Sequence, residues 1–217
     1  MRDAIEISTD SHPSASIIWL HGLGADGSDF VPVAEQLALP LAVRFVFPHA
    51  PLRAVTVNGG YRMPAWYDIY TLDIAGVQDE AGIRGSRLML EALVRKEISR
   101  GVAPDRIVLA GFSQGGAIAL HTALRYPERL GGVLALSTYL PMAHAPDDER
   151  SAANHGIPVF MAHGVSDTVI PLGVASRSRD RLLASGYGVE WHEYPMAHSV
   201  CEAEIGDIRR FLIAKLD

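Results

Sequence analysis

The stretch from Gly111 to Gly115, GFSQG, places one serine between glycines at the end of an apolar run. This is the G-x-S-x-G pattern of a nucleophile elbow, a strand-to-helix turn so tight that β-carbons beside the serine would collide with neighbouring backbone. A serine on such a turn exposes its Oγ and faces the N-terminus of the next helix. Ser113 is therefore a candidate nucleophile. The alternative is a glycine-rich turn whose serine only caps a helix.

A serine hydroxyl is a weak nucleophile unless a base removes its proton, and the base needs a carboxylate to hold its tautomer. Elbow enzymes carry serine, acid and histidine in that order along the chain. Asp167, in HGVSDTVIP, and His198, in YPMAHSV, each follow a strand-like run in this order. Taken singly, Asp167 also fits a turn residue and His198 a surface histidine. Together the three residues predict a catalytic triad of Ser113, Asp167 and His198.

An acyl-transfer site also needs two donors for the oxyanion of its tetrahedral intermediate. One is expected to be the backbone N–H of Gln114, the residue after the nucleophile, and the other comes from a loop after an early strand. The loop WLHGLGADGSDF follows such a strand and holds Leu23 between Gly22 and Gly24. We expect the amides of Leu23 and Gln114 to form the oxyanion hole. A plain glycine turn is the alternative for the first loop.

The elements that must position these residues alternate along the chain. Short apolar runs typical of strands lie at 4–8, 16–22, 43–48, 106–112, 131–137, 157–164 and 188–195. Helical patterns lie at about 28–38, 76–99, 114–126, 172–185 and 199–215. This alternation predicts an α/β fold, with a mostly parallel central sheet and helices on both faces. Such sheets bind their ligands beyond the carboxyl ends of the strands, where all three candidate residues fall.

Length and composition limit the architecture and the partners. The 217 residues, 48% hydrophobic and 20% charged, fit one domain spanning 1–217, and no repeat or linker divides them. The net charge of −6 is spread along the chain and offers no basic stripe, so nucleic acid is not an expected partner. The single cysteine, Cys201, excludes an internal disulfide framework.

We expect a cytoplasmic protein without an integral membrane segment. The N-terminal stretch carries Asp3 and Glu6 and lacks the apolar core of a secretory signal. The one long uncharged run, between Arg106 and Arg125, is interrupted by serine, glutamine and glycines, which favours strand-turn-helix over a bilayer span.

No cofactor and no metal are expected. The chain lacks G-x-G-x-x-G and G-x-x-x-x-G-K-[ST] after a strand, and it lacks H-E-x-x-H. His21 and His163 are expected to orient loops by hydrogen bonding, and His121 to pack in the core. Cys201 lies at a helix start without an elbow and is expected to be an inert thiol.

Six motifs together resemble the phospholipase/carboxylesterase family of small α/β-hydrolases, which includes bacterial carboxylesterases and acyl-protein thioesterases. They are LHGLGADG, FPHAP, AWYDI, GFSQGGA, HGVSDTVIP and YPMAHSV, and the resemblance spans about residues 15 to 202. It implies an α/β-hydrolase fold without a separate cap domain, the same triad and oxyanion hole, and a substrate groove lined by Leu23, Tyr70 and Leu72. Thr138 and Ala197 stand where the family usually has glycine, which puts the width of the pocket in doubt.

Two further segments are expected to shape the substrate site. Residues 49–76 are aromatic and poorly periodic, so we expect them to fold over the site as an acyl-binding wall, with Trp66 and Asp68 in internal packing and hydrogen bonding. Residues 139–156 are expected to form the opposite rim. Within that rim, Asp147 to Arg150 are typical of a solvated helix start.

The expected activity is that of a serine carboxylesterase acting on short- to medium-chain esters, acyl thioesters or lysophospholipids through an acyl-enzyme on Ser113. The substrate is then a small-molecule ester or thioester, or an acylated protein. Exposed apolar loops leave room for a homodimer. A peptidase of the same fold and a non-catalytic binding module are the alternatives.

Overall fold

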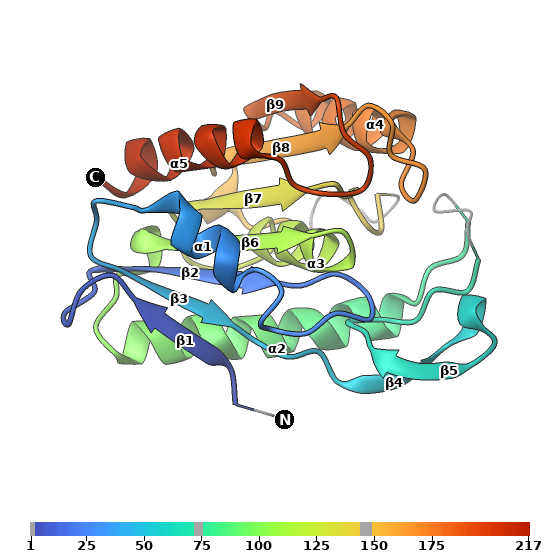
Figure 1. Cartoon of the computed structure of the whole chain (residues 1–217), viewed down its shortest axis with the longest axis horizontal. Coiled ribbons are helices and arrows are strands. Elements are labelled where there is room, and N and C mark those ends of the chain that lie inside the picture. The colour runs from blue at the N-terminus through green and yellow to red at the C-terminus, as the bar shows by residue number, and fades with distance from the viewer. Residues whose placement is uncertain (1–2, 72–75, 144–148) are drawn as a thin grey trace.

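A computed structural model describes residues 3–71, 76–143 and 149–217. These residues contain a seven-stranded sheet in the order β1-β3-β2-β6-β7-β8-β9 (Figure 1). Its strands are β1 (Ile5–Ser8), β2 (Ala15–Leu20), β3 (Val43–Phe47), β6 (Ile107–Phe112), β7 (Gly132–Leu136), β8 (Val159–Gly164) and β9 (Val189–Tyr194). Only the β1–β3 pair is antiparallel. The mostly parallel sheet and all seven expected strands are therefore confirmed.

Helices cover both faces of this sheet. They are α1 (Val31–Leu37), α2 (Glu80–Ser99), α3 (Gln114–Ala123), α4 (Leu172–Ala184) and α5 (Glu202–Leu216). Helices α1 and α5 lie on the near face in Figure 1, and α2, α3 and α4 lie on the far face. In the described part of the chain, no helix is both long enough and apolar enough to cross a bilayer.

The core consists of two clusters because side chains alternate across a sheet. In β2, Ile17 and Trp19 pack with α1 and α5, whereas Ile18 and Leu20 pack with α2 and α3. Every residue of β2 is buried, so the strand reads as one continuous apolar run. The same double cover makes β7 and β8 fully buried. The carboxyl ends of the strands, where the candidate residues lie, are therefore supported by closely packed, buried strands.

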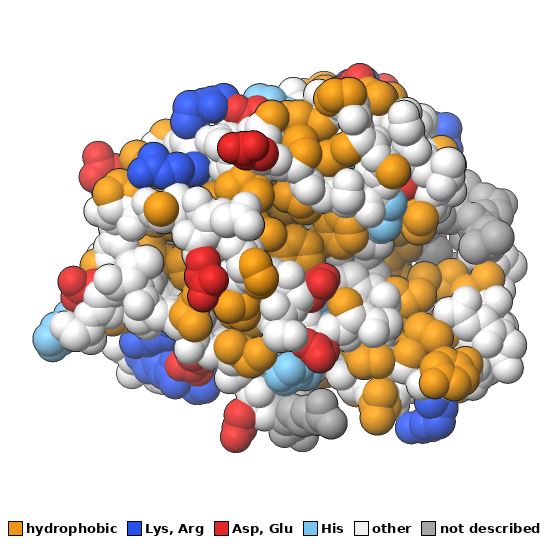
Figure 2. Space-filling model, in the orientation of Figure 1, with side chains coloured by type: hydrophobic (Ala, Val, Ile, Leu, Met, Phe, Trp, Pro, Cys, Tyr) orange, Lys and Arg blue, Asp and Glu red, His pale blue; other side chains and the backbone are white. Residues whose placement is uncertain are grey.

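A separate hairpin lies outside the main sheet, within the segment that was expected only to form a poorly periodic wall. It pairs β4 (Leu52–Val55) with β5 (Tyr61–Pro64) as a two-stranded antiparallel sheet. Gly59 and Gly60 at its turn have φ of +65° and +79°, which glycine adopts at little cost. Leu52 is 63% exposed and Tyr61 70% exposed, and Figure 2 shows apolar side chains gathered over the hairpin. Because neither face of these strands is consistently buried, no period of two marks them in the sequence.

Candidate active site

Ser113 lies on the turn between β6 and α3. Its φ of 54° and ψ of −122° are unfavourable for a residue with a side chain and are typical of a strained functional turn. Two backbone bonds hold the turn: the Ser113 N–H donates to Leu136 O at 2.9 Å, and the Ala117 N–H donates to Ser113 O at 3.1 Å. Thr138 Oγ1 also donates to Ser113 O at 2.6 Å. Thr138, which stands where the family usually has glycine, therefore supports this turn.

Glycine is required on both sides of this serine. A β-carbon on Gly111 would come within 3.0 Å of the backbone of Gly115 and Gly116. A β-carbon on Gly115 would come equally close to the carbonyl groups of Leu20 and His21. Real β-carbons do not approach backbone this closely, so only glycine lets β6, α3 and the end of β2 meet.

Asp167 and His198 are joined by a short hydrogen bond. His198 Nδ1 lies 2.6 Å from Asp167 Oδ2, and the carboxylate is fully buried while the imidazole is 16% exposed. The other oxygen, Oδ1, accepts from the N–H groups of Val169 at 2.8 Å and Ile170 at 2.9 Å. The carboxylate is thus fixed on both oxygens, and it can hold the imidazole with Nδ1 protonated.

The loops after β8 and β9 meet through a glycine that the sequence analysis did not single out. A β-carbon on Gly164 would come within 3.0 Å of the carbonyl oxygens of Met196 and Ala197. The Ser166 N–H also donates to Met196 O at 3.0 Å. Gly164 therefore lets the loop of His198 close over the loop of Asp167. Its place in HGVSD was the available signal, but the close approach depends on a loop thirty residues further on.

Phe112 links the serine to the imidazole, because it precedes Ser113 in the chain and its ring packs against His198. The rings of Phe112 and His198 have their centroids 4.7 Å apart, and Ser113 is the next residue in the chain. Within the described residues, no hydrogen bond joins Ser113 Oγ to His198. Catalytic hydrogen bonds are often long without substrate and tighten when it binds.

A second histidine touches the same carboxylate. His163 Nε2 lies 2.7 Å from Ile170 O and 3.3 Å from Asp167 Oδ2, and the residue is completely buried. Burial lowers the pKa of His163, so the ring is neutral at ordinary pH. The expected loop-orienting role is confirmed, and the contact with Asp167 is an addition that the sequence did not predict.

His21 orients the loop of the expected oxyanion hole. Its Nδ1 lies 2.7 Å from Gly22 O, and its Nε2 accepts from the Ala50 N–H at 3.0 Å. Burial lowers its pKa. His121 is packed in the core, as expected, and burial together with nearby Arg125 lowers its pKa to about 3.

Leu23 and Gln114, whose amides are expected to bind an oxyanion, line the same cavity as Ser113. Gln114 is the first residue of α3, where a helix leaves its N–H unpaired. Across the ranges that the structure describes, neither this amide nor that of Leu23 donates to a protein acceptor. The neighbouring Gly24 N–H donates to Pro64 O at 2.9 Å, which ties the Leu23 loop to β5.

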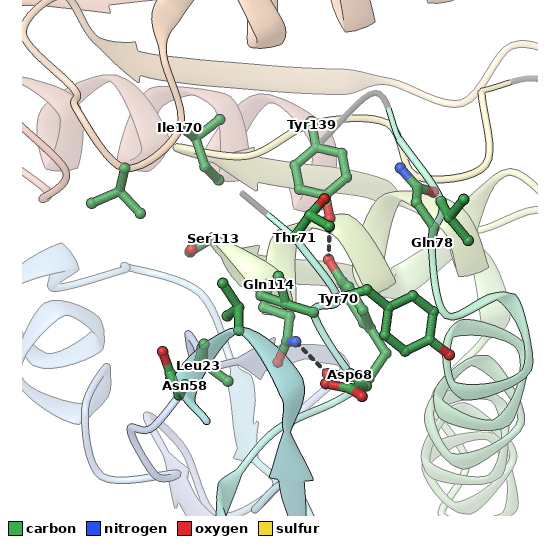
Figure 3. A pocket seen from close by; sticks show the side chains of 15 residues that line it. Leu23, Asn58, Asp68, Tyr70, Thr71, Gln78, Ser113, Gln114, Tyr139 and Ile170 are labelled. Carbon is green, nitrogen blue, oxygen red and sulfur yellow. Dashed lines mark hydrogen bonds between the residues drawn. The ribbon is translucent and has the colours of Figure 1, made fainter. Parts of the chain in front are cut away.

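A cavity of about 260 Å³ opens beside Ser113 (Figure 3). Leu23 and Tyr70 line it, as the resemblance implied, whereas Leu72 lies outside the described residues. The side chain of Gln114 binds one wall: its Oε1 accepts from Trp66 N at 2.8 Å, and its Nε2 donates to Tyr67 O at 2.7 Å. The residue after the nucleophile therefore also positions the pocket.

The wall residues Trp66 and Asp68 differ in their surroundings. Trp66 is 2% exposed and donates from Nε1 to His21 O at 2.9 Å. Asp68 accepts from the N–H of Thr56 at 2.7 Å and from its Oγ1 at 2.6 Å. These contacts confirm packing and hydrogen bonding, but Asp68 is only half-buried because it also faces the cavity.

The expected solvated helix start on the opposite rim is wrong for Glu149. Its carboxylate binds Arg84 Nη2 at 2.8 Å and Arg125 Nε at 3.2 Å. These guanidinium groups lower the pKa of Glu149 to about 2. The carboxylate is thus paired with α2 and with the segment that follows α3, contacts that the local sequence does not reveal. Asp147 and Asp148 lie outside the described residues.

Over residues 3–71, 76–143 and 149–217, no group of three or more histidine, cysteine, aspartate or glutamate side chains is arranged to hold a metal ion. The acidic and basic side chains of the site instead bind one another and the backbone.

Comparison with known proteins gives a consistent assignment. The model of the phospholipase/carboxylesterase family matches residues 2–216. Acyl-protein thioesterase 1 of Neurospora crassa is 39% identical, over 94% of this chain and 87% of the relative. Among solved structures, acyl-protein thioesterase 2 of Zea mays superposes with a TM-score of 0.84 at 28% identity, covering 99% of both chains. SOBER1 of Arabidopsis thaliana gives a TM-score of 0.89 at 27% identity, covering 94% of this chain and 99% of that chain.

Proposed function

Because the chain belongs to the phospholipase/carboxylesterase family of α/β-hydrolases, we propose that it hydrolyses short- to medium-chain carboxylic esters through an acyl-enzyme on Ser113. The family and the thioesterase relatives make it a hydrolase of the esterase and thioesterase class. The proposal treats residues 1–217 as one catalytic domain.

The observation that carries the proposal is an elbow serine next to Phe112, whose ring packs on the imidazole of an acid–imidazole pair with a buried carboxylate. Ser113 stands at φ 54° between glycines that cannot be replaced, and His198 lies 2.6 Å from the buried carboxylate of Asp167. A glycine-rich turn with a capping serine would need neither feature. The serine, moreover, makes no side-chain cap on α3.

In the proposed reaction, Ser113 Oγ attacks the carbonyl carbon while His198 Nε2 takes the hydroxyl proton. Asp167 holds Nδ1 and stabilises the imidazolium. The amides of Leu23 and Gln114 donate to the oxyanion of the tetrahedral intermediate. His198 then protonates the leaving alcohol or thiol, and water, activated by the same imidazole, releases the acid and restores the serine.

A second candidate activity is acyl-protein thioesterase. It is favoured by relatives of that name at 36–40% identity, among them one from Mycosarcoma maydis at 40%. An ester and a thioester pass through the same acyl-enzyme, so the site residues keep their roles. As part of this proposal, we predict that the substrate is an acylated protein. We also predict that the protein forms a homodimer and is located in the cytoplasm.

Parallel assays test both activities. Wild-type protein and Ser113→Ala are assayed on p-nitrophenyl esters from acetyl to dodecanoyl, on the matching acyl thioesters, and on an aminoacyl amide. We expect hydrolysis of esters and thioesters with a maximum at short to medium chains, lost in Ser113→Ala. Turnover of the amide alone, or full activity in Ser113→Ala, would overturn the proposal.

A further inference from the structure

Two tyrosine hydroxyls meet at the buried side of the cavity beside Ser113. Tyr67 Oη and Tyr139 Oη lie 2.7 Å apart, and the residues are 2% and 8% exposed. Both line the cavity, and Figure 3 shows the bond as a dashed line at the hydroxyl of the labelled Tyr139. Tyr67 follows β5 and Tyr139 follows β7, so the pair bridges two walls.

This pair has one more donor than it can use internally. Each phenol carries one O–H, and a bond between the two hydroxyls consumes only one of these hydrogens. In the ranges that the structure describes, neither hydroxyl has another hydrogen-bond partner. A buried donor without an acceptor is unfavourable, so an oxygen atom entering the cavity would satisfy it.

The donor is present at any pH at which the protein would be assayed. Burial raises the pKa of Tyr67 well above its ordinary value, and the nearby Tyr139 raises it further. Burial also raises the pKa of Tyr139. Both phenols therefore stay protonated, and the second O–H is a permanent feature of the cavity.

The remaining lining is mostly apolar. Its apolar side chains are those of Leu23, Val57, Ile69, Val77, Val169 and Ile170, and its further polar side chains are those of Asn58, Asp68, Thr71 and Gln78. A mostly apolar cavity with a few fixed polar groups is typical of a site that reads one polar position on its ligand.

The position of this donor is also fixed relative to the nucleophile. Gln114 Nε2 donates to Tyr67 O at 2.7 Å, and Gln114 directly follows Ser113. An acyl group attached to Ser113 would therefore meet the hydroxyl pair at a set distance along its chain.

We propose that the cavity selects acyl groups that carry an oxygen acceptor, an oxo or ether oxygen, along the chain, and that the hydroxyls of Tyr67 and Tyr139 recognise this oxygen. The inference rests on the proposed function, because it concerns the acyl group of the same substrate. A site that hydrogen-bonds a substrate group discriminates against the analogue lacking it, because its own polar group is then left unpaired. A pair that only tied the walls together would affect stability and not selectivity.

The test compares esters that differ only in this oxygen. Wild-type protein is assayed on p-nitrophenyl hexanoate, 4-oxohexanoate and 5-oxohexanoate, and each kcat/KM is divided by the rate constant of hydroxide hydrolysis of that ester. We expect at least one oxo ester to exceed hexanoate by about 10-fold. Tyr67→Phe, Tyr139→Phe and the double variant keep the rings, and in each the ratio of oxo ester to hexanoate should fall toward one. The readout is this ratio within each variant, whatever the absolute activity.

Tyr126→Phe is the matched control, because Tyr126 is a buried tyrosine that does not line the cavity. Its ratio should equal that of the wild type. A wild-type ratio of one with good hydrolysis of hexanoate would overturn this inference and leave the proposed function standing. A ratio that survives in the double variant would also overturn it. Failure of the wild type to hydrolyse any of the three esters would instead refute the proposed function. If the variants do not fold, inhibition of the wild type by free 5-oxohexanoate and by free hexanoate gives the same comparison. We expect the oxo acid to bind more tightly, and equal binding of the two acids would overturn the inference.

Discussion

Two neighbouring regions of this molecule are built by different means. The elbow corner, residues 111–115, 163–170 and 194–198, is held by backbone contacts that leave no space for a β-carbon at Gly111, Gly115 or Gly164. The wall region consists of the expected acyl-binding wall and the residues that follow it up to α2 (49–71 and 76–79). It is held by the β4–β5 ladder and by side-chain hydrogen bonds, and a β-carbon on its Gly59 or Gly60 would meet nothing within 4 Å. The corner therefore tolerates little change, whereas the wall can change without disturbing the proposed chemistry.

This difference implies that the corner determines the reaction, whereas the wall determines which acyl groups are accepted. Backbone approach fixes where Ser113, Asp167 and His198 lie, and few sequences satisfy it. Side-chain bonds such as Asp68 to Thr56 position the wall, and other side chains can replace them. A fold built in this way keeps one reaction while its pocket accepts different acyl groups.

The largest contrast is expected from removing a carboxylate charge in each region. Asp167→Asn should lower kcat by about 10³- to 10⁴-fold, because an amide neither stabilises the imidazolium nor holds Nδ1 protonated. Steady-state kinetics on a p-nitrophenyl ester measure this.

Asp79→Asn in the wall region is the matched control. Asp79 Oδ1 caps α2 by accepting from the Gly82 N–H at 2.9 Å, a role that asparagine can take, whereas its Oδ2 accepts from the Asp68 N–H at 2.9 Å, which an amide NH2 cannot do. Stability should fall by about 1 to 2 kcal/mol from the lost bond, while activity stays within about 3-fold of wild type, because Asp79 takes no part in the proposed reaction. Equal losses of activity in the two variants would erase the distinction between the regions.

A methyl group added in each region should separate them by stability. Gly115→Ala should lower the free energy of unfolding by about 3 kcal/mol, because the new β-carbon would overlap the carbonyls of Leu20 and His21. Gly60→Ala should cost about 1 kcal/mol, from its φ of +79° alone. Urea unfolding of both variants gives the comparison, and a smaller loss in Gly115→Ala than in Gly60→Ala would contradict it.

Helix α5 carries a buried carboxyl group, which should make the free energy of unfolding depend on pH. Glu204 is fully buried in α5, and burial raises its pKa from 4.5 to about 8. Between these values the folded protein keeps a proton that the unfolded chain releases. Stability should therefore fall as pH rises through this window, by up to about 1.4 kcal/mol per pH unit.

Glu204→Gln should flatten that slope, measured by urea unfolding at intervals from pH 5 to 8. Glu35→Gln on the exposed side of α1 is the control and should keep the wild-type slope. An unchanged slope in Glu204→Gln would show that the carboxyl is ionised in the folded protein.

The smallest effect is expected where the two regions join. Gln114→Met keeps the backbone amide but removes the bonds to Trp66 N and Tyr67 O. We expect KM to rise by about 5-fold, the equivalent of about 1 kcal/mol, with kcat within about 2-fold. A fall in kcat at constant KM would show that the side chain acts on the reaction and not on the wall.

The sequence predicted what depends on local pattern. The central strands β2, β3, β6, β7 and β8 were visible because burial on both faces produces continuous apolar runs. The elbow was visible because its glycines lie two residues on either side of Ser113. Asp167 and His198 were found from their positions after strands, and the structure places them in hydrogen-bonding contact. Their catalytic roles stay predictions.

What the sequence did not predict depends on contacts between distant segments. The approach of Gly164 to Ala197 and the pairing of Tyr67 with Tyr139 each join parts of the chain whose spacing carries no local signal. The β4–β5 hairpin was missed because its exposed strands have no buried face. Glu149 was misread because its charge partners lie on α2 and beside α3.

The most direct test of the central claim is to locate the covalent intermediate. Protein treated with a fluorophosphonate is digested, and the modified peptide is identified by mass spectrometry. We expect a single adduct on Ser113, absent from Ser113→Ala and formed about 10³-fold more slowly in His198→Ala. An adduct on another residue, or labelling of Ser113→Ala at the wild-type rate, would contradict the account.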